Sequence, residues 1–342
     1  MIIAIQPSYG NPAAIRHFHD TLERDVDFTA PPLWTALSPP QRQALRSLHP
    51  DGHARFWGGT ANQGRLLDEL TLGDVILFTG KGHIQGIGEF GVGFDSPTVG
   101  DLLWSPHPTN GTYRHVYTLR SFTRTLLPNR TLQDAIGSSH NDSFQGLRLL
   151  RDTARVDAVT IGLGIRTRTA ADEELAAAQN LAATLASEQP PGSSLVAAEQ
   201  LHTASGTYTP AQRDIEFRRV EALLVESYIA TLPPAADHRR VRCQAGLTDL
   251  YVIDPPSYDL VEAKCAATHH HIRTALGQLL DYTYGMPDMP ITTLTLLVPE
   301  RPADPDLALL YHYGIDCLYR SAPGQFRREP APSDRQGCWR PG

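Results

Sequence analysis

An alternation of helical and strand patterns in the second half of the chain constrains the fold most strongly. A helical pattern begins near Pro210, and short apolar runs follow at 248–253 and 260–264. A second helical stretch covers about 270–284, and another apolar run occupies 292–298. Short apolar runs between helical segments are typical of strands in a buried sheet. The order helix, strand, strand, helix, strand predicts an α/β domain with a mixed central sheet.

The first half of the chain predicts a separate sheet. Apolar runs at 74–79 and 84–90 flank the glycine-containing turn 80–83, and 115–119 is a further strand candidate. Strands joined by glycine-rich turns favour a strongly curved sheet or a small β-barrel with associated helices. With 342 residues, of which 41% are hydrophobic, the chain has room for two domains.

Composition predicts where these domains begin and end. We expect the first domain at 1–165 and a helical linker at 166–205, where an alanine- and leucine-rich stretch precedes a proline-rich one. The α/β domain then covers 206–320. Residues 321–342 are rich in proline, arginine and serine, which predicts a loose tail.

Charge and hydropathy argue against some broad classes of protein. The formal net charge of −7 indicates no large basic surface, although a local basic patch is compatible with it. No apolar run approaches the roughly 18 residues of a membrane span, and the apolar patch at the N-terminus is too short for a signal peptide. The four cysteines form no Cys-x-x-Cys pair, which argues against structural zinc. We therefore expect a cytoplasmic protein without membrane contact.

Charged residues interrupt the apolar runs of the α/β domain. Asp249 lies in the first run, while Glu262 and Lys264 alternate in the second and so project from one face of a strand. Lys264 is one of only two lysines, the other being Lys81. Carboxylates bind hard cations such as Mg²⁺ or Mn²⁺, and an ammonium group can hold an attacking water. This combination predicts metal-dependent phosphodiester hydrolysis, with the main-chain carbonyl of Ala263 as a third metal ligand.

The flanking helical segments add further candidates. Glu221 lies on the helix before the strands and can complete the metal shell, with Glu226 as its competitor. Gln278 and Tyr282 are four residues apart on the following helix, so they share one face and can address the site or the DNA backbone. The alternative for Glu262 and its neighbouring lysine is a solvated ion pair, which the apolar flanks disfavour.

These residues together resemble the PD-(D/E)xK nuclease superfamily, in its RecB-like branch with a Gln-x-x-x-Tyr element. The matching positions are Glu221, Asp249, 262–264, Gln278 and Tyr282. The resemblance covers about 206–320, with Thr248 where the family name has a proline. It implies an α/β sheet flanked by helices, with the acids at the centre of the sheet.

Short segments of the first domain that each contain an aromatic residue resemble the EVE-like members of the PUA superfamily. These segments are 55–58, 72–78, 102–104, 113–117 and 144–146. Such barrels read modified bases, and similar ones are coupled to nucleases in Mcr-type, modification-dependent (type IV) restriction systems. The resemblance covers about 30–160 and implies a β-barrel that binds double-stranded DNA with a modified cytosine, such as 5-methylcytosine.

Recognition of a modified base within a duplex favours its extrusion into a pocket with aromatic walls and polar edge readers. We predict Trp57, Trp34 and Phe144 as walls, and Asp142 and Gln145 as edge readers. For each aromatic residue, packing in the hydrophobic core is the alternative.

Basic residues at two places are candidates for contacts with the DNA backbone. Lys81 lies at the tip of the predicted hairpin, and Arg239, Arg240 and Arg242 precede the first strand of the α/β domain. A solvated surface is the alternative for both groups.

The two resemblances imply a modification-dependent DNA endonuclease that restricts methylated foreign DNA. A homodimer is expected because cutting both strands needs two active sites and each chain offers one. Three alternatives stay open: a methyl-DNA-binding protein with a weak or silent nuclease domain, a protein that acts on modified RNA, and a repair nuclease without base preference.

Overall fold

The structure is a computed structural model that describes residues 1–188 and 210–340. Its internal contacts divide the chain into two units, Met1–Asp172 and Glu173–Gly342. The boundary lies a few residues beyond the predicted end at 165. A physical reason is the buried carboxylate of Glu89, which accepts hydrogen bonds from the main-chain N–H groups of Arg168 (2.6 Å) and Thr169 (2.9 Å) and so holds these residues to the first unit.

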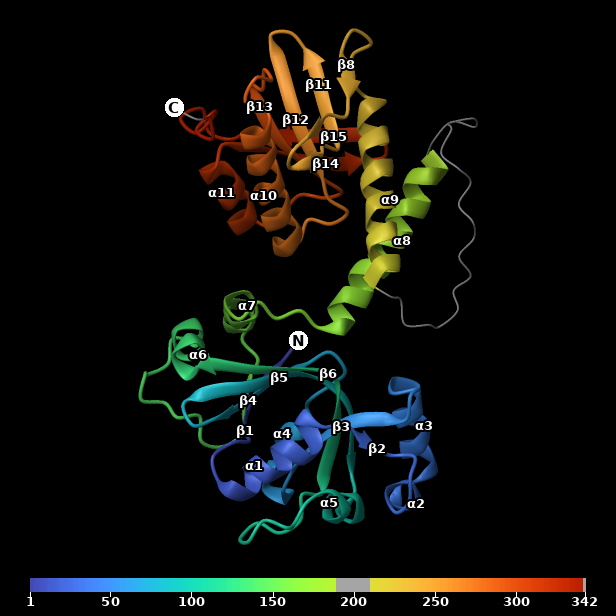
Figure 1. Cartoon of the computed structure of the whole chain (residues 1–342), viewed down its shortest axis with the longest axis vertical. Helices are drawn as coiled ribbons and strands as arrows, with labels where there is room; N and C mark the ends of the chain where they lie inside the picture. The colour runs from blue at the N-terminus through green and yellow to red at the C-terminus, as the bar shows by residue number, and fades with distance from the viewer. Residues whose placement is uncertain (189–209, 341–342) are drawn as a thin grey trace. The chain divides into compact units, whose positions relative to one another are not determined.

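The first unit contains a seven-stranded sheet in the order β2-β3-β6-β5-β4-β1-β7 (Figure 1). Its strands are β1 (Ile3–Pro7), β2 (Val26–Asp27), β3 (His53–Gly59), β4 (Val75–Gly80), β5 (His83–Asp95), β6 (His115–Pro128) and β7 (Arg148–Leu150). Strands β1 and β4 are parallel, and the other neighbours pair antiparallel. The predicted hairpin is confirmed, because β4 and β5 are joined by Lys81 and Gly82, both at positive φ, as in a type I′ turn.

Of the two predicted alternatives, a strongly curved sheet or a small β-barrel, the described residues of the first unit do not form the barrel. The strand pairing ends at β2 on one side and at β7 on the other, and these two strands have two and three residues. Strands this short offer few backbone groups for closing a sheet on itself. Register shifts between β5 and β6 mark where the ladder is irregular, so the unit is an open sheet bent by bulges.

Alternate residues of the central strands pack into two separate hydrophobic cores. Ile3 and Ile5 of β1 belong to one apolar cluster, whereas Ala4 belongs to another. This period of two places successive side chains on opposite faces. Both faces are covered, and the strands therefore read as continuous apolar runs. The covering helices are α1 (Pro12–Phe18), α2 (Leu33–Ala36), α3 (Pro39–Leu48), α4 (Gly64–Leu67), α5 (Pro97–Leu103), α6 (Asn129–Ile136) and α7 (Thr153–Gly162).

The second unit contains the predicted mixed sheet, in the order β15-β14-β13-β12-β11-β8. Its strands are β8 (Asp237–Arg239), β11 (Leu250–Asp254), β12 (Ser257–Ala263), β13 (Thr293–Val298), β14 (Ile315–Ala322) and β15 (Gln325–Glu329). Strands β12, β13 and β14 are parallel, β11 and β15 pair antiparallel with this group, and β8 pairs antiparallel with β11. A separate two-stranded ribbon is formed by β9 (Arg242–Cys243) and β10 (Gly246–Leu247).

Helices cover both faces of this sheet, which confirms the α/β expectation. Leu260 and Leu296 pack with α10 (His269–Gly285) and α11 (Asp304–His312), and Val261 and Leu297 pack with α8 (Arg168–Glu188) and α9 (Pro210–Ile229). Helix α8 falls in the predicted helical linker, but its later residues belong to this core. Residues 189–205 of that linker lie outside the described residues.

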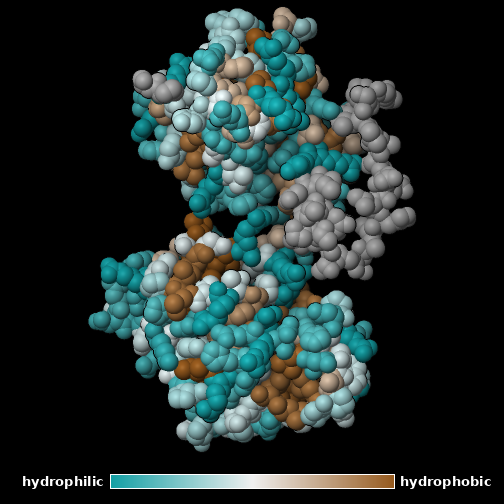
Figure 2. Space-filling view, viewed as in Figure 1, coloured by the Kyte–Doolittle hydropathy of each residue, from teal (hydrophilic) through white to brown (hydrophobic). Residues whose placement is uncertain are grey.

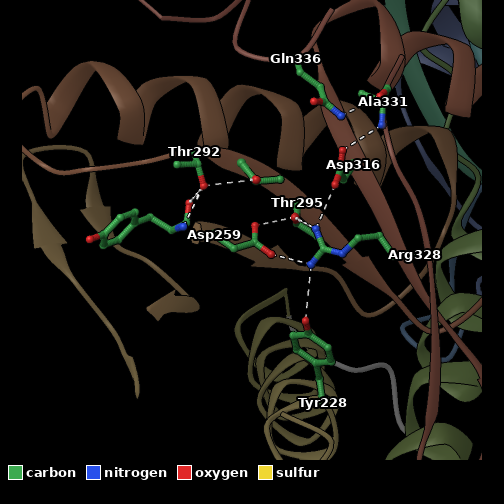
Figure 3. A network of polar contacts seen from close by, with 10 residues as sticks. Tyr228, Asp259, Thr292, Thr295, Asp316, Arg328, Ala331 and Gln336 are labelled. Carbon is green, nitrogen blue, oxygen red and sulfur yellow. Dashed lines mark hydrogen bonds and ion pairs between the residues drawn. The ribbon is translucent and has the colours of Figure 1, made fainter. Parts of the chain in front are cut away.

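The predicted loose tail is also wrong, because β15 is a strand of the sheet. Its Arg328 lies among buried acids (Figure 3) and donates to Asp259 at 2.5 Å and to Asp316 at 3.0 Å. The main-chain N–H of Ala331 donates to the same Asp316 at 2.9 Å. Buried carboxylates require a cationic or hydrogen-bonding partner, and the C-terminal segment supplies both.

The surface shown in Figure 2 is mostly hydrophilic, and its hydrophobic residues form separate patches. Within the described ranges, no helix combines the length and the apolar character that a membrane span needs.

Candidate functional site

A cleft of about 720 Å³ in the second unit brings the predicted catalytic side chains together. Its lining includes Glu221, Asp249, Glu262, Lys264, Gln278 and Tyr282. They come from α9, the start of β11, the end of β12, and α10. The antiparallel pairing of β11 with β12 places Leu250 opposite Val261. Asp249 therefore lies beside the end of β12, where its Oδ2 accepts a hydrogen bond of 2.9 Å from the N–H of Ala263.

Lys264 is the charged centre of this cleft and is only 5% exposed. Its Nζ donates to Glu262 Oε1 at 2.7 Å and to the carbonyl oxygen of Ala263 at 2.9 Å. Glu221 Oε1 lies 3.9 Å from the same Nζ. One ammonium group therefore faces two carboxylates directly, with Asp249 as a third acid in the lining.

Burial and the proximity of like charges raise the pKa values of two acids in the cleft. Burial, together with the carboxylate of Asp249, raises the pKa of Glu262 to about 8. Burial also raises the pKa of Glu221 to about 7, against the opposing effect of Lys264. Burial by itself would lower the pKa of Lys264, but the carboxylates of Glu262 and Glu221 outweigh it and the pKa is raised. The cleft thus holds an excess of acidic groups that a cation would stabilise.

One observation indicates that the residues of the cleft fit a divalent cation. The second oxygen of Glu262, Oε2, is buried and has no hydrogen-bond partner in the structure, and the same holds for Gln278 Oε1. Hard cations take such oxygens as ligands. No three His, Cys, Asp or Glu side chains of the described residues already converge as a metal cluster. The predicted ligand set is Asp249, Glu262, Glu221 and the Ala263 carbonyl, so its three acids do not converge as such a cluster in the described structure.

Glu262→Gln should reduce the loss of stability as the pH rises from about 5 to about 8. The pKa of Glu262 is about 8, raised from its ordinary 4.5. A carboxyl group with a raised pKa in the folded state favours folding at low pH and loses this contribution as the pH rises through the folded value. The free energy of unfolding of the native chain should therefore fall between about pH 5 and pH 8. Glutamine does not ionise and should remove part of this fall.

Urea unfolding of both proteins across that pH range, without divalent metal, measures the effect. An equally steep decline in the variant would contradict the titration of Glu262 in the folded state.

Basic side chains surround the mouth of the cleft. Arg239 and Arg240 line it and are exposed, as the predicted contacts with the DNA backbone require. Arg240 donates through Nε to the carbonyl of Thr248 at 2.8 Å, and its guanidinium lies 3.7 Å from Asp249 Oδ1. Arg242 is exposed on β9 and does not line the cleft. Arg218 of α9 lines it as well.

The aromatic pocket predicted for the first unit is not assembled. Trp57, Trp34 and Phe144 belong to three different apolar clusters. Phe144 is completely buried, and Trp34 stacks with Arg42 and Arg46 at 4.9 and 4.5 Å from the ring centroid. The large apolar area of aromatic side chains makes core packing their favoured position.

The predicted edge readers are also apart from a common pocket. Asp142 forms a two-pronged pair with Arg148, at 2.6 and 2.9 Å, and accepts from the N–H of Phe144 at 3.0 Å. Gln145 is exposed. Lys81 is exposed at the hairpin tip, as expected, with its Nζ 5.6 Å from the centroid of the Tyr9 ring.

A cavity of about 410 Å³ lies instead on one side of Trp57. Its polar lining includes Gln6, Thr60, Asn62, Gln63, His107 and Asn110, none of which we predicted. The sequence contains one signal for it, because Gln6 interrupts the apolar run of β1. A buried amide in a central strand requires a partner, and this side chain is only 3% exposed.

Comparison with solved structures gives a likeness for part of the chain. No protein-family model matches the chain. A search of curated proteins finds no match either. The N-terminal half resembles a solved structure described as the N-terminal domain of Thermococcus gammatolerans McrB bound to m5C DNA. The two share 12% sequence identity over 48% of this chain and 98% of that chain, with a TM-score of 0.38.

Proposed function

We propose that this chain is a modification-dependent DNA endonuclease. The second unit would hydrolyse the phosphodiester backbone with Mg²⁺ or Mn²⁺, and the first unit would bind DNA that carries a modified cytosine such as 5-methylcytosine. The observation that carries the nuclease proposal is the buried contact of Lys264 with Glu262, beside Asp249 and Glu221 in one cleft. Desolvating such groups costs free energy, and ionisable groups perturbed in this way cluster at functional sites.

Each residue has a defined task in this proposal. Asp249, Glu262 and the carbonyl of Ala263 would hold the cation, which neutralises charge on the phosphate and acidifies a water. Lys264 donates from Nζ to the attacking water and stays charged because Glu262 is 2.7 Å away. Arg239 and Arg240 attract the DNA backbone to the mouth of the cleft by their charge.

The cavity beside Trp57 supports the proposed reading of a base. Gln6 and Trp57 line it, and their buried atoms Gln6 Oε1 and Trp57 Nε1 have no hydrogen-bond partner among the described residues. They offer one acceptor and one donor. The Watson–Crick edge of an extruded base presents a donor next to an acceptor, so such an edge would satisfy both atoms.

Cleavage of matched plasmids, with and without cytosine methylation and across several divalent metals, tests the whole proposal. We expect cleavage only when the plasmid is methylated and Mg²⁺ or Mn²⁺ is present. Methylated plasmid that stays intact while a gel shift persists would indicate a reader with a silent nuclease domain. Equal cutting of both plasmids would indicate a nuclease without base preference. Stronger competition by modified RNA than by methylated duplex would indicate an RNA substrate.

A further inference from the structure

Thr248 directly precedes the proposed metal ligand Asp249 and stands where the name of the resembling nuclease superfamily has a proline. It is completely buried. A proline has neither an N–H group nor a hydroxyl group, and Thr248 uses both. Its N–H donates to the carbonyl oxygen of Val241 at 3.0 Å, and its Oγ1 accepts from the N–H of Val241 at 2.9 Å. Two hydrogen bonds therefore hold Val241 to the residue before the acid.

The strand pairing around Thr248 contains one extra residue. The pairs on its two sides are Arg239 with Tyr251 and Arg242 with Leu247. Residues 248–250 therefore lie opposite residues 240–241, so one strand has three residues where its partner has two. An extra residue of this kind forms a β-bulge, which redirects side chains and is frequent next to active sites. Here the bulge contains Asp249 and faces Arg240, and both residues line the cleft.

The guanidinium of Arg240 is held beside this acid. Its Nε donates to the carbonyl oxygen of Thr248 at 2.8 Å, and one of its outer nitrogens lies 3.7 Å from Asp249 Oδ1. The other oxygen of that carboxylate, Oδ2, accepts from the N–H of Ala263. Among the described residues, no acceptor lies within hydrogen-bonding distance of the two outer nitrogens of Arg240. The side chain is 56% exposed, so a ligand from solvent can reach these nitrogens.

The available edge of this guanidinium fits a phosphate. Two nitrogens of a planar guanidinium match two phosphate oxygens. An exposed ion pair contributes little free energy, so a phosphate can replace Asp249 as the partner of Arg240 at little cost. In the proposed reaction Asp249 binds the cation, and the phosphate that is cleaved therefore lies next to it.

Arg239 offers the same charge without the same restraint. It lines the cleft and is exposed, as Arg240 is. Within the described part of the chain, however, no hydrogen bond fixes its guanidinium in the way that the carbonyl of Thr248 fixes Arg240. The two arginines should therefore act differently on DNA.

We propose that Arg240 binds the scissile phosphate during cleavage and that Thr248 is the residue that positions it. The inference rests on the proposed nuclease function of the second unit. In hydrolysis, water forms the new P–O bond and gives up a proton to solvent. The P–O bond to the leaving sugar oxygen breaks with its electron pair, and that oxygen takes up a proton. Arg240 takes part in neither bond and stabilises the charge on the other phosphate oxygens, which a fixed donor does best.

Single-turnover cleavage of methylated plasmid with Mg²⁺, at saturating protein, tests the role of Arg240. We expect Arg240→Ala to lower the rate by about 10²-fold, while a gel shift without divalent metal shows binding within about threefold of wild type. Arg239→Ala is the matched control. It should weaken binding in the gel shift and leave the saturated rate within about twofold.

The outcomes separate this inference from the proposed function. A wild-type chain that cuts no DNA would overturn the proposed function and this inference with it. A wild-type chain that cuts DNA, together with an Arg240→Ala variant that cuts at the same saturated rate, would overturn the inference alone. Equal losses of saturated rate in Arg240→Ala and Arg239→Ala would also overturn it.

A double-mutant cycle tests the role of Thr248. Thr248→Val keeps a similar shape but removes Oγ1, and it should lower the saturated rate by about tenfold. Thr248→Ser keeps the hydroxyl group and should cut within about threefold of wild type. In an Arg240→Ala background, Thr248→Val should change the rate by less than about twofold, because the guanidinium that it positions is absent. A tenfold loss in that background as well would overturn the assignment of Thr248 as the residue that positions Arg240.

Discussion

Lys264→Ala should lower the rate of DNA cleavage by about 10²–10⁴-fold while leaving DNA binding within a few fold. The Nζ of Lys264 is the only ammonium group among the residues that line the cleft in the described structure. Its loss removes the donor that would hold the attacking water. The fold should persist, because the raised pKa of Glu262 lets that carboxyl group take up a proton when its partner is gone.

Nicking of methylated plasmid with Mg²⁺ or Mn²⁺ measures the rate, and a gel shift measures binding. Lys264→Arg should be nearly as inactive, because a planar guanidinium does not fit where a compact ammonium group bonds Glu262 and the Ala263 carbonyl. Arg273→Ala, which removes an exposed charge from α10, is the control and should cut normally. Cleavage at the wild-type rate by the alanine variant would rule out the proposed catalytic site.

Arg328→Ala should lower the free energy of unfolding of the second unit by about 3–5 kcal/mol. The guanidinium lies 2.5 Å from Asp259 and 3.0 Å from Asp316, and both carboxylates are almost completely buried. Burial already raises the pKa of Asp259 in spite of the opposing effect of Arg328. Without the cation, two buried acids would face each other and one strand of the sheet would lose its main polar anchor.

Urea denaturation and thermal melting measure this effect, and the melting temperature should fall by about 10 °C. Arg327→Ala provides a closely matched control, because Arg327 is the preceding residue of β15 and is exposed. Its effect should stay within about 0.5 kcal/mol. If the two variants lose the same small amount of stability, the network in Figure 3 does not anchor the C-terminal strand.

The cleft around Lys264 could be predicted because its geometry follows from local rules. Strands β11 and β12 form a hairpin with Asp254 opposite Ser257. A tight connection fixes the register, and register fixes which side chains become neighbours. The spacing of Gln278 and Tyr282 on one helix is equally local. Asp249, Glu262 and Lys264 could therefore be placed in one site before any tertiary contact was known.

The base pocket and the C-terminal strand could not be predicted in this way. Which face of Trp57 borders a cavity depends on how β3 pairs with β6 and on the segments that cover them. Likewise, Arg328 finds its partner Asp259 across 69 residues of sequence. A proline- and arginine-rich composition does not reveal such a partner, so the segment resembled a loose tail.

The sequence by itself determined the alternation of helices and strands in the second unit, the hairpin at Lys81 and the grouping of acids around Lys264. These features depend on periodicity and on short connections, which act over a few residues. The tertiary structure alone decided that the first sheet stays open, that β15 completes the second sheet, and that the polar cavity lies beside Gln6 and Trp57. These features depend on packing and on buried polar pairs between distant segments, whose free energy exists only once the chain has folded.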